Sequence, residues 1–202
     1  MVPQLCIDAA RLSLLAYSGH TWVWPGDVEA LRGNLNGIDG FAARGTEPDE
    51  ITDWLRDLRG FPVMANELGV RLHAGFWKAA RRSWPDIQAE LWPHREVVFT
   101  GHSMGAAIAT IWAALAVRQG FRVKALVTFG SPRVGWSGLG RLLEGVPVFR
   151  YHRGGDMVPR HPWPVWGYSH VDQPIRLPGS GLPISDHAVD GYLEALLREA
   201  AD

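Results

Sequence analysis

The order of apolar and polar positions divides the chain into alternating helical and extended segments. Leu5, Ala9, Leu12 and Leu15 recur at the spacing of one helical face. Runs of β-forming residues predict strands at 37–46, 96–100, 123–129, 146–151 and 171–177. Helical patterns cover 73–92, broken or kinked near Pro85, then 106–119 and 188–200. This alternation predicts an α/β fold with a mainly parallel central sheet and helices on both faces.

One further amphipathic segment follows the first predicted strand. Pro48 and several acidic residues mark a helix start, and Ile51, Trp54, Leu55 and Leu58 share one apolar face. Two interpretations are open for this helix. Trp54 and Leu58 form the inner side of a short lid over a binding site, or the helix is fixed and seals the core.

Length and composition limit the classes of protein that fit. With 202 residues, residues 1–202 are predicted to form a single domain, and the Pro- and Gly-rich stretch 154–183 is interpreted as connections within it. A formal net charge of −1 gives no nucleic-acid footprint, so no nucleic-acid partner is expected. Cys6 is the only cysteine, which excludes an internal disulfide and a multi-thiolate metal site.

The first residues bear on location. The segment 1–19 lacks a basic leader, and Asp8 and Arg11 interrupt its apolar run. No stretch approaches the ~20 apolar residues of a membrane span. We therefore expect a cytoplasmic protein without a transmembrane segment, with secretion after processing or release by lysis as the alternatives.

The clearest chemical signal is Gly-His-Ser-Met-Gly at 101–105, between a predicted strand and a predicted helix. The pattern G-x-S-x-G places a serine on a tight strand-to-helix turn that exposes its hydroxyl, and the glycines allow strand and helix to pass closely. The turn also directs the Met104 N–H at a carbonyl that the serine would attack. The pattern therefore favours Ser103 as a nucleophile over an ordinary serine turn.

A serine nucleophile needs a base, and the base needs an orienting acid. In this kind of sheet the chain order is serine, acid, histidine. Asp156 follows a predicted strand and His187 lies in a loop before the last helix, so both are candidates. His170 is the rival base and Asp172 the rival acid. A third reading makes Ser185 or Asp186 a helix cap with His187 exposed.

Several ordered segments then resemble the class 3 lipases, the fungal and plant lipases with the α/β-hydrolase fold. The segments are "GFAARGTE", "ITDWLRDL", "LHAGFWKA", "VVFTGHSMGAAIA", "LVTFGSPRVG", "FRYHRGGDMVPRHP" and "ISDHAVDGYLEAL". They extend from about residue 38 to residue 197. Three positions depart from the usual pattern, which has an aromatic at Ala43, leucine at Met104 and glycine at Ala106. The chain lacks the disulfides of secreted members, and a minimal lid is expected.

The resemblance implies a catalytic triad of Ser103, Asp156 and His187. It implies that the backbone N–H groups of Met104 and Thr46 form the oxyanion hole, the Thr46 hydroxyl assisting. The reaction implied is hydrolysis of carboxylic esters of the acylglycerol type through an acyl-enzyme, with a lipid substrate and transient contact with a lipid interface. No metal or organic cofactor is needed.

The residues that would contact the substrate are predicted from their positions along the chain. Trp54, Leu58, His102, Trp163 and Trp166 are the candidates, with packing of a long loop as the alternative for the last two. Two other functions are weighed: a different acyl hydrolase, such as a phospholipase A or a thioesterase, and a non-catalytic binding protein on the same fold.

Overall fold

The computed structural model describes residues 2–18, 22–24, 28–45 and 61–201. Seven strands form one sheet in the order β1-β2-β3-β6-β7-β8-β9. They are β1 (Trp22–Trp24), β2 (Val28–Leu35), β3 (Ile38–Ala43), β6 (Glu96–His102), β7 (Arg122–Phe129), β8 (Val148–Arg153) and β9 (Pro174–Leu177). Strands β3, β6, β7, β8 and β9 are mutually parallel, whereas β1 and β2 add an antiparallel edge. The mainly parallel sheet is therefore confirmed.

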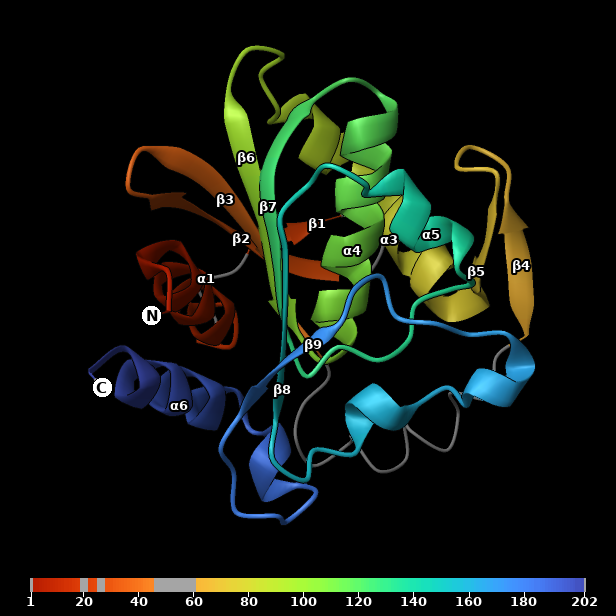
Figure 1. Cartoon of the computed structure of the whole chain (residues 1–202). Coiled ribbons are helices and arrows are strands. Elements are labelled where there is room, and N and C mark those ends of the chain that lie inside the picture. Colours follow the sequence, from red (N-terminus) through yellow and green to blue (C-terminus); the bar gives the residue numbers. More distant parts are fainter. Residues whose placement is uncertain (1, 19–21, 25–27, 46–60, 202) are drawn as a thin grey trace.

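Helices cover both faces of the sheet (Figure 1). One face carries α1 (Gln4–Leu15) and α6 (Val189–Ala201), which contact each other. The other face carries α3 (Ala74–Ala89), α4 (Met104–Arg118) and α5 (Gly138–Leu142), beside a hairpin of β4 (Pro62–Ala65) and β5 (Val70–His73). Single turns of 3-10 helix, η1 (Val158–Arg160), η2 (Pro164–Trp166) and η3 (Ser185–His187), lie in the loops.

Two apolar cores result from this arrangement, one on each face. Trp112 of α4, Phe99 of β6 and Trp84 of α3 belong to the larger core, and Phe129, Tyr151 and Tyr192 belong to the smaller one. The α4 sequence is apolar on all sides, and its residues from Gly105 to Ala116 are buried. Burial on both sides makes the central strands continuous apolar runs, as parallel strands require.

Two details differ from the sequence predictions. Helix α3 continues through Pro85, so the predicted break does not occur: Trp77, Trp84 and Ile87 bury the same helix face on both sides of the proline. The strands β1, β2, β4 and β5 were not predicted. The turn from β2 to β3 is Asn36-Gly37, with φ of 52° and 89°, the left-handed pair that a tight hairpin turn needs.

The predicted lid helix, with Trp54 and Leu58, lies outside the described residues, as does Thr46.

Candidate active site

Ser103 lies at the junction between β6 and α4, at the carboxyl edge of the parallel strands. Its backbone has φ 58° and ψ −128°, which a non-glycine residue adopts only under strain of about 1–3 kcal/mol. A Cβ built on Gly105 would overlap the backbone of Ala43 in β3, so only glycine lets the helix approach the sheet there. The fold therefore holds the serine in the strained turn that the motif predicts.

Asp156 follows β8 and is fully buried. Its Oδ2 accepts hydrogen bonds from His187 Nδ1 at 2.9 Å and from the Tyr192 hydroxyl at 2.6 Å. Its Oδ1 accepts the N–H of Val158 at 2.9 Å. Three donors surround one carboxyl group, which is the environment of an ionised acceptor. Burial, together with the adjacent Asp156, raises the pKa of Tyr192 well above its ordinary value, so Tyr192 stays a donor.

His187 ends the η3 turn and is 5% exposed. Because the Asp156 carboxylate only accepts, Nδ1 of His187 carries the hydrogen and Nε2 is left with a lone pair. Nε2 of His187 and Oγ of Ser103 are both buried, and neither has a hydrogen-bond partner in the part of the chain that the structure describes. A base with a free lone pair and a hydroxyl with a free proton are what proton transfer requires.

The end of strand β7 lies against both Ser103 and His187. The Ser103 N–H donates to the carbonyl of Phe129 at 3.0 Å. The next residue, Gly130, lies directly against the His187 ring, since a Cβ added there would be 3.0 Å from the Cε1 and Nδ1 of that ring. The carboxyl end of β7 thus contacts both the Ser103 backbone and the His187 ring.

His102, the residue before the serine, is buried and has both ring nitrogens engaged. Its Nε2 lies 2.6 Å from the backbone carbonyl of His187, so Nε2–H donates. Nδ1 then accepts from the Tyr17 hydroxyl at 2.9 Å, and that hydroxyl accepts the N–H of Gly45 at 3.2 Å. Burial, reinforced by the neighbouring His187, lowers the pKa of His102 well below its ordinary value, so the ring stays neutral.

The rival residues are engaged elsewhere. His170 donates through Nε2 to the carbonyl of Pro159 at 2.8 Å, and burial lowers its pKa to about 3. Asp172 accepts the N–H of Gln173 at 2.7 Å. Among the described residues the structure therefore brings together Asp156 and His187, not this pair.

The remaining candidates lie around this centre. Met104 is the first residue of α4, where the helix dipole is positive. Trp163 precedes the η2 turn and Trp166 ends it, with exposed fractions of 53% and 46%. Tyr17 and Tyr192 contact the site but were not predicted from the sequence. Both fall in amphipathic helical patterns, where a tyrosine is expected to be a core residue. Within the described ranges, no three His, Cys, Asp or Glu side chains gather as a metal site.

This geometry agrees with the comparison of the sequence with protein families. The family described as lipase (class 3) matches residues 41–166, more than half of the chain. The chain belongs to the class 3 lipase family. The match contains Ser103 and Asp156 and ends before the His187 loop.

Curated relatives of this class 3 lipase chain include enzymes named as acylglycerol lipases and enzymes named as phospholipases. The secreted mono- and diacylglycerol lipase 1 of Fusarium solani is 35% identical over 122 residues, covering 56% of this chain and 36% of that protein. Phospholipase A1-II 1 of Oryza sativa subsp. japonica is 31% identical over 123 residues, covering 53% of this chain and 31% of that protein. The chain spans about a third to a half of the length of the curated relatives it matches.

Solved structures support the fold. The Rhizomucor miehei triacylglyceride lipase superposes with a TM-score of 0.71 at 22% identity, over 86% of this chain and 78% of that one. The class 3 lipase chain therefore has the α/β-hydrolase fold of the fungal lipases, as predicted.

The expected cytoplasmic location is wrong. Relatives from Fusarium, Penicillium and Gibberella are named as secreted lipases, which points to an extracellular protein. A short apolar helix pattern without a basic leader was a poor indicator of compartment. None of the helices in the described ranges has the length and apolar character needed to cross a bilayer.

Proposed function

We propose that this protein is a secreted serine hydrolase that cleaves carboxylic esters of acylglycerols through an acyl-enzyme. The observation that carries the proposal is the 2.9 Å hydrogen bond from His187 Nδ1 to the buried Asp156, which leaves Nε2 free in the interior that also holds the unpartnered Ser103 hydroxyl. A non-catalytic binding protein has no need for a strained serine or for an imidazole with an unsatisfied nitrogen.

The mechanism follows from which atoms carry hydrogens. His187 Nε2 accepts the proton of Ser103 as Oγ attacks the ester carbonyl carbon, and Asp156 stabilises the imidazolium that forms. The backbone N–H groups of Met104 and Thr46 would stabilise the oxyanion, and loss of one such donor typically costs ~10²- to 10³-fold in turnover. His187 then protonates the leaving alcohol. A water molecule, activated by the same Nε2, hydrolyses the acyl-enzyme.

Lipid esters are the substrate class that the relatives support. The Fusarium relative is named a mono- and diacylglycerol lipase, and the rice relative a phospholipase A1. Trp163 and Trp166 expose large apolar rings on the loop that carries Asp156, so we assign them to acyl-chain or interface contact. Trp54 and Leu58 are assigned the same role from sequence alone. Phospholipase activity is the second candidate, favoured by the rice relative.

A fluorophosphonate probe tests the chemistry. We expect the wild-type protein to be labelled at Ser103 and to hydrolyse p-nitrophenyl butyrate. Ser103→Ala should lose labelling and at least ~10⁴-fold of turnover. Ser185→Ala is the matched control, because this exposed serine lies two residues from His187, and it should behave as wild type. Absence of labelling in the folded wild type would exclude a serine hydrolase.

A second assay separates the two lipid classes. Rates are compared on emulsified diacylglycerol and on phosphatidylcholine vesicles of the same acyl chain. Faster release of fatty acid from diacylglycerol is expected, and a faster rate on phosphatidylcholine would support the phospholipase instead.

A further inference from the structure

Asp186, next to His187 in the chain, is a fully buried carboxylate that the mechanism above does not use. We propose that Asp186 is a positioning residue that fastens the loop carrying His187 to the loop carrying Asp156, and so sets the geometry of the hydrogen bond between them. The inference rests on the proposed function, because it concerns a residue that acts through the His187 base.

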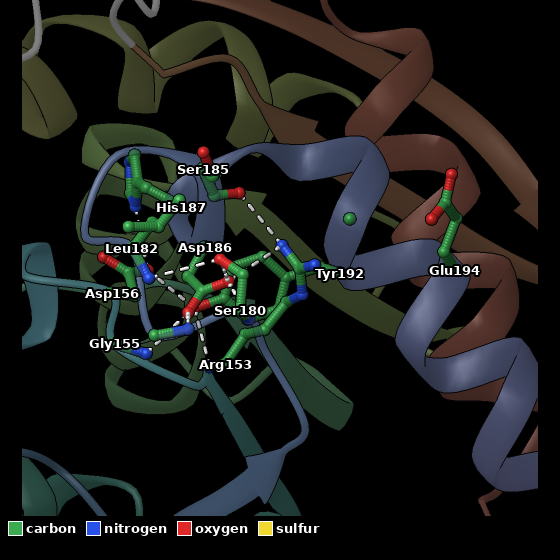
Figure 2. Close-up of polar contacts among 12 residues, drawn as sticks. Arg153, Gly155, Asp156, Ser180, Leu182, Ser185, Asp186, His187, Tyr192 and Glu194 are labelled. Carbon is green, nitrogen blue, oxygen red and sulfur yellow. Dashed lines mark hydrogen bonds and ion pairs between the residues drawn. The ribbon is translucent and has the colours of Figure 1, made fainter.

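The Asp186 carboxylate is saturated with donors (Figure 2). Its Oδ2 accepts the N–H groups of Gly155 and Gly181, both at 2.7 Å. Its Oδ1 accepts the N–H of Ser180 at 2.7 Å and the hydroxyl of Ser180 at 2.9 Å. Three of the four donors belong to the backbone, so the carboxylate holds the path of the chain and not only a side chain.

These donors come from the two segments that carry the candidate base and acid. Gly155 immediately precedes Asp156, Ser180 and Gly181 lie in the loop that leads to η3, and Asp186 immediately precedes His187. Displacement of the carboxylate would therefore shift Asp156 and His187 relative to each other. A displacement of about 1 Å of this kind typically costs ~10²-fold in rate.

The surrounding sequence leaves room for this carboxylate. A Cβ on Gly154 would overlap Oδ2 of Asp186, and a Cβ on Gly179 would lie 2.6 Å from the same oxygen. Real side chains do not tolerate such contacts. The glycine-rich tracts "HRGGD" and "PGSG", which the sequence alone reads as loops, are thus the two sides of the Asp186 pocket.

Asp186 is ionised near neutral pH. Burial by itself would raise its pKa, but the hydrogen bonds from Gly155, Ser180 and Gly181 outweigh it and lower the pKa to about 2. The Arg153 guanidinium adds an ion pair at 3.6 Å and also donates to the carbonyl of Ser185 at 3.0 Å. An ordinary helix-capping role does not account for the Asp186 hydrogen bonds, since none of their donors belongs to α6.

Asp186→Asn is the decisive variant. It keeps the shape but replaces one acceptor oxygen by an NH₂ group that faces N–H donors. We expect kcat for p-nitrophenyl butyrate to fall about 10²-fold, with KM within a factor of two of wild type. Asp190→Asn is the matched control: this exposed carboxylate, three residues beyond His187, accepts the N–H of Gly191 and should give wild-type kcat.

A spectroscopic signature separates positioning from a general loss of stability. The His187 Nδ1 proton should give a downfield ¹H signal in wild type and Asp190→Asn, and should broaden or disappear in folded Asp186→Asn. Gly179→Ala is the second variant. Gly179 lies in an exposed loop, and a Cβ there would displace the Asp186 carboxylate without removing any polar group. It should show the same fall in kcat, and it decides the matter if Asp186→Asn does not fold.

The result that overturns the inference is wild-type kcat and an unchanged downfield signal in a folded Asp186→Asn or Gly179→Ala protein. An inactive, unlabelled wild type would instead contradict the proposed function, so the two failures are distinguishable.

Discussion

The hydroxyl of Tyr192 lies 2.6 Å from Oδ2 of Asp156, the same oxygen that accepts the Nδ1–H of His187. Tyr192 is buried in α6, and its oxygen also accepts the N–H of Arg153 at the end of β8. The last helix thus contributes directly to the orientation of the acid. The position of α6 therefore affects the geometry of the site.

Removal of that hydroxyl should weaken the acid's orientation. For Tyr192→Phe we expect kcat to fall about tenfold, because a hydrogen bond to a charged group contributes about 1.5 kcal/mol or more. KM should change little. Tyr151→Phe is the control, since Tyr151 stacks on Phe129 and its hydroxyl pairs with Cys6. Steady-state kinetics of both variants check this, and a wild-type kcat in Tyr192→Phe would contradict it.

The bond from His102 to the His187 carbonyl leads to a second prediction. His102→Phe keeps an aromatic ring but loses the donor at 2.6 Å, so kcat should fall about tenfold with chain-length preference unchanged. Tyr17→Phe removes only the outer link and should have a smaller effect. Profiles on p-nitrophenyl esters of increasing chain length measure both quantities. An altered preference at unchanged kcat would instead support the substrate contact predicted from sequence.

Close approach of α4 to β3 predicts a large cost at Gly105. Because a Cβ there would overlap the Ala43 backbone, Gly105→Ala should lower the free energy of unfolding by about 3 kcal/mol. Gly75→Ala is the control, as its Cβ would meet only the His73 ring, at 3.3 Å. Urea denaturation compares the two variants. Equal denaturation midpoints would show that the turn between β6 and α4 relaxes to accept the added Cβ.

Buried histidines should make the protein sensitive to acid. Burial lowers the pKa of His73 to about 4, while an unfolded histidine titrates near 6.5. The unfolded chain therefore binds the proton first as pH falls, so the stability from a neutral His73 is complete above about pH 6.5 and is lost toward pH 4.

His73→Gln removes this titration. Between pH 4.5 and 6 the dependence of the unfolding free energy on pH should become shallower by up to about 1.4 kcal/mol per pH unit. His94→Gln, at an exposed position, is the matched control. Denaturation series at several pH values measure the slope. A parallel curve for His73→Gln would show that the ring is not buried neutral.

Local pattern was a good guide where one signal dominated. Helices α1, α4 and α6 and strands β6 and β7 match their predicted positions within a few residues, because apolar runs and helical periodicity are strong there. The hairpin of β2 and β3 was only half predicted, although Asn36-Gly37 is a turn signal. Its strand β2 alternates weakly, since Arg32 and Asn34 are exposed although they share a face with the buried Val28 and Ala30.

The candidate site shows the same division. Chain order limited the acid and the base to a few residues, and position and family resemblance favoured Asp156 and His187 over Asp172 and His170. The structure brings the first pair to 2.9 Å at the carboxyl edge of the sheet. That choice depends on β8 and on the η3 turn meeting in space, and their separation of about thirty residues has no local signature.

The amino-acid sequence by itself determined the strained serine turn, the alternation of strands and helices and the family, because these depend on short-range sterics and periodic burial. Only the tertiary structure showed that the Asp156 carboxylate and the His187 imidazole lie 2.9 Å apart, and that Asp186, Tyr17, His102 and Tyr192 surround them. Hydrogen bonds between distant loops act over about 3 Å, so they exist only once packing has fixed where those loops lie.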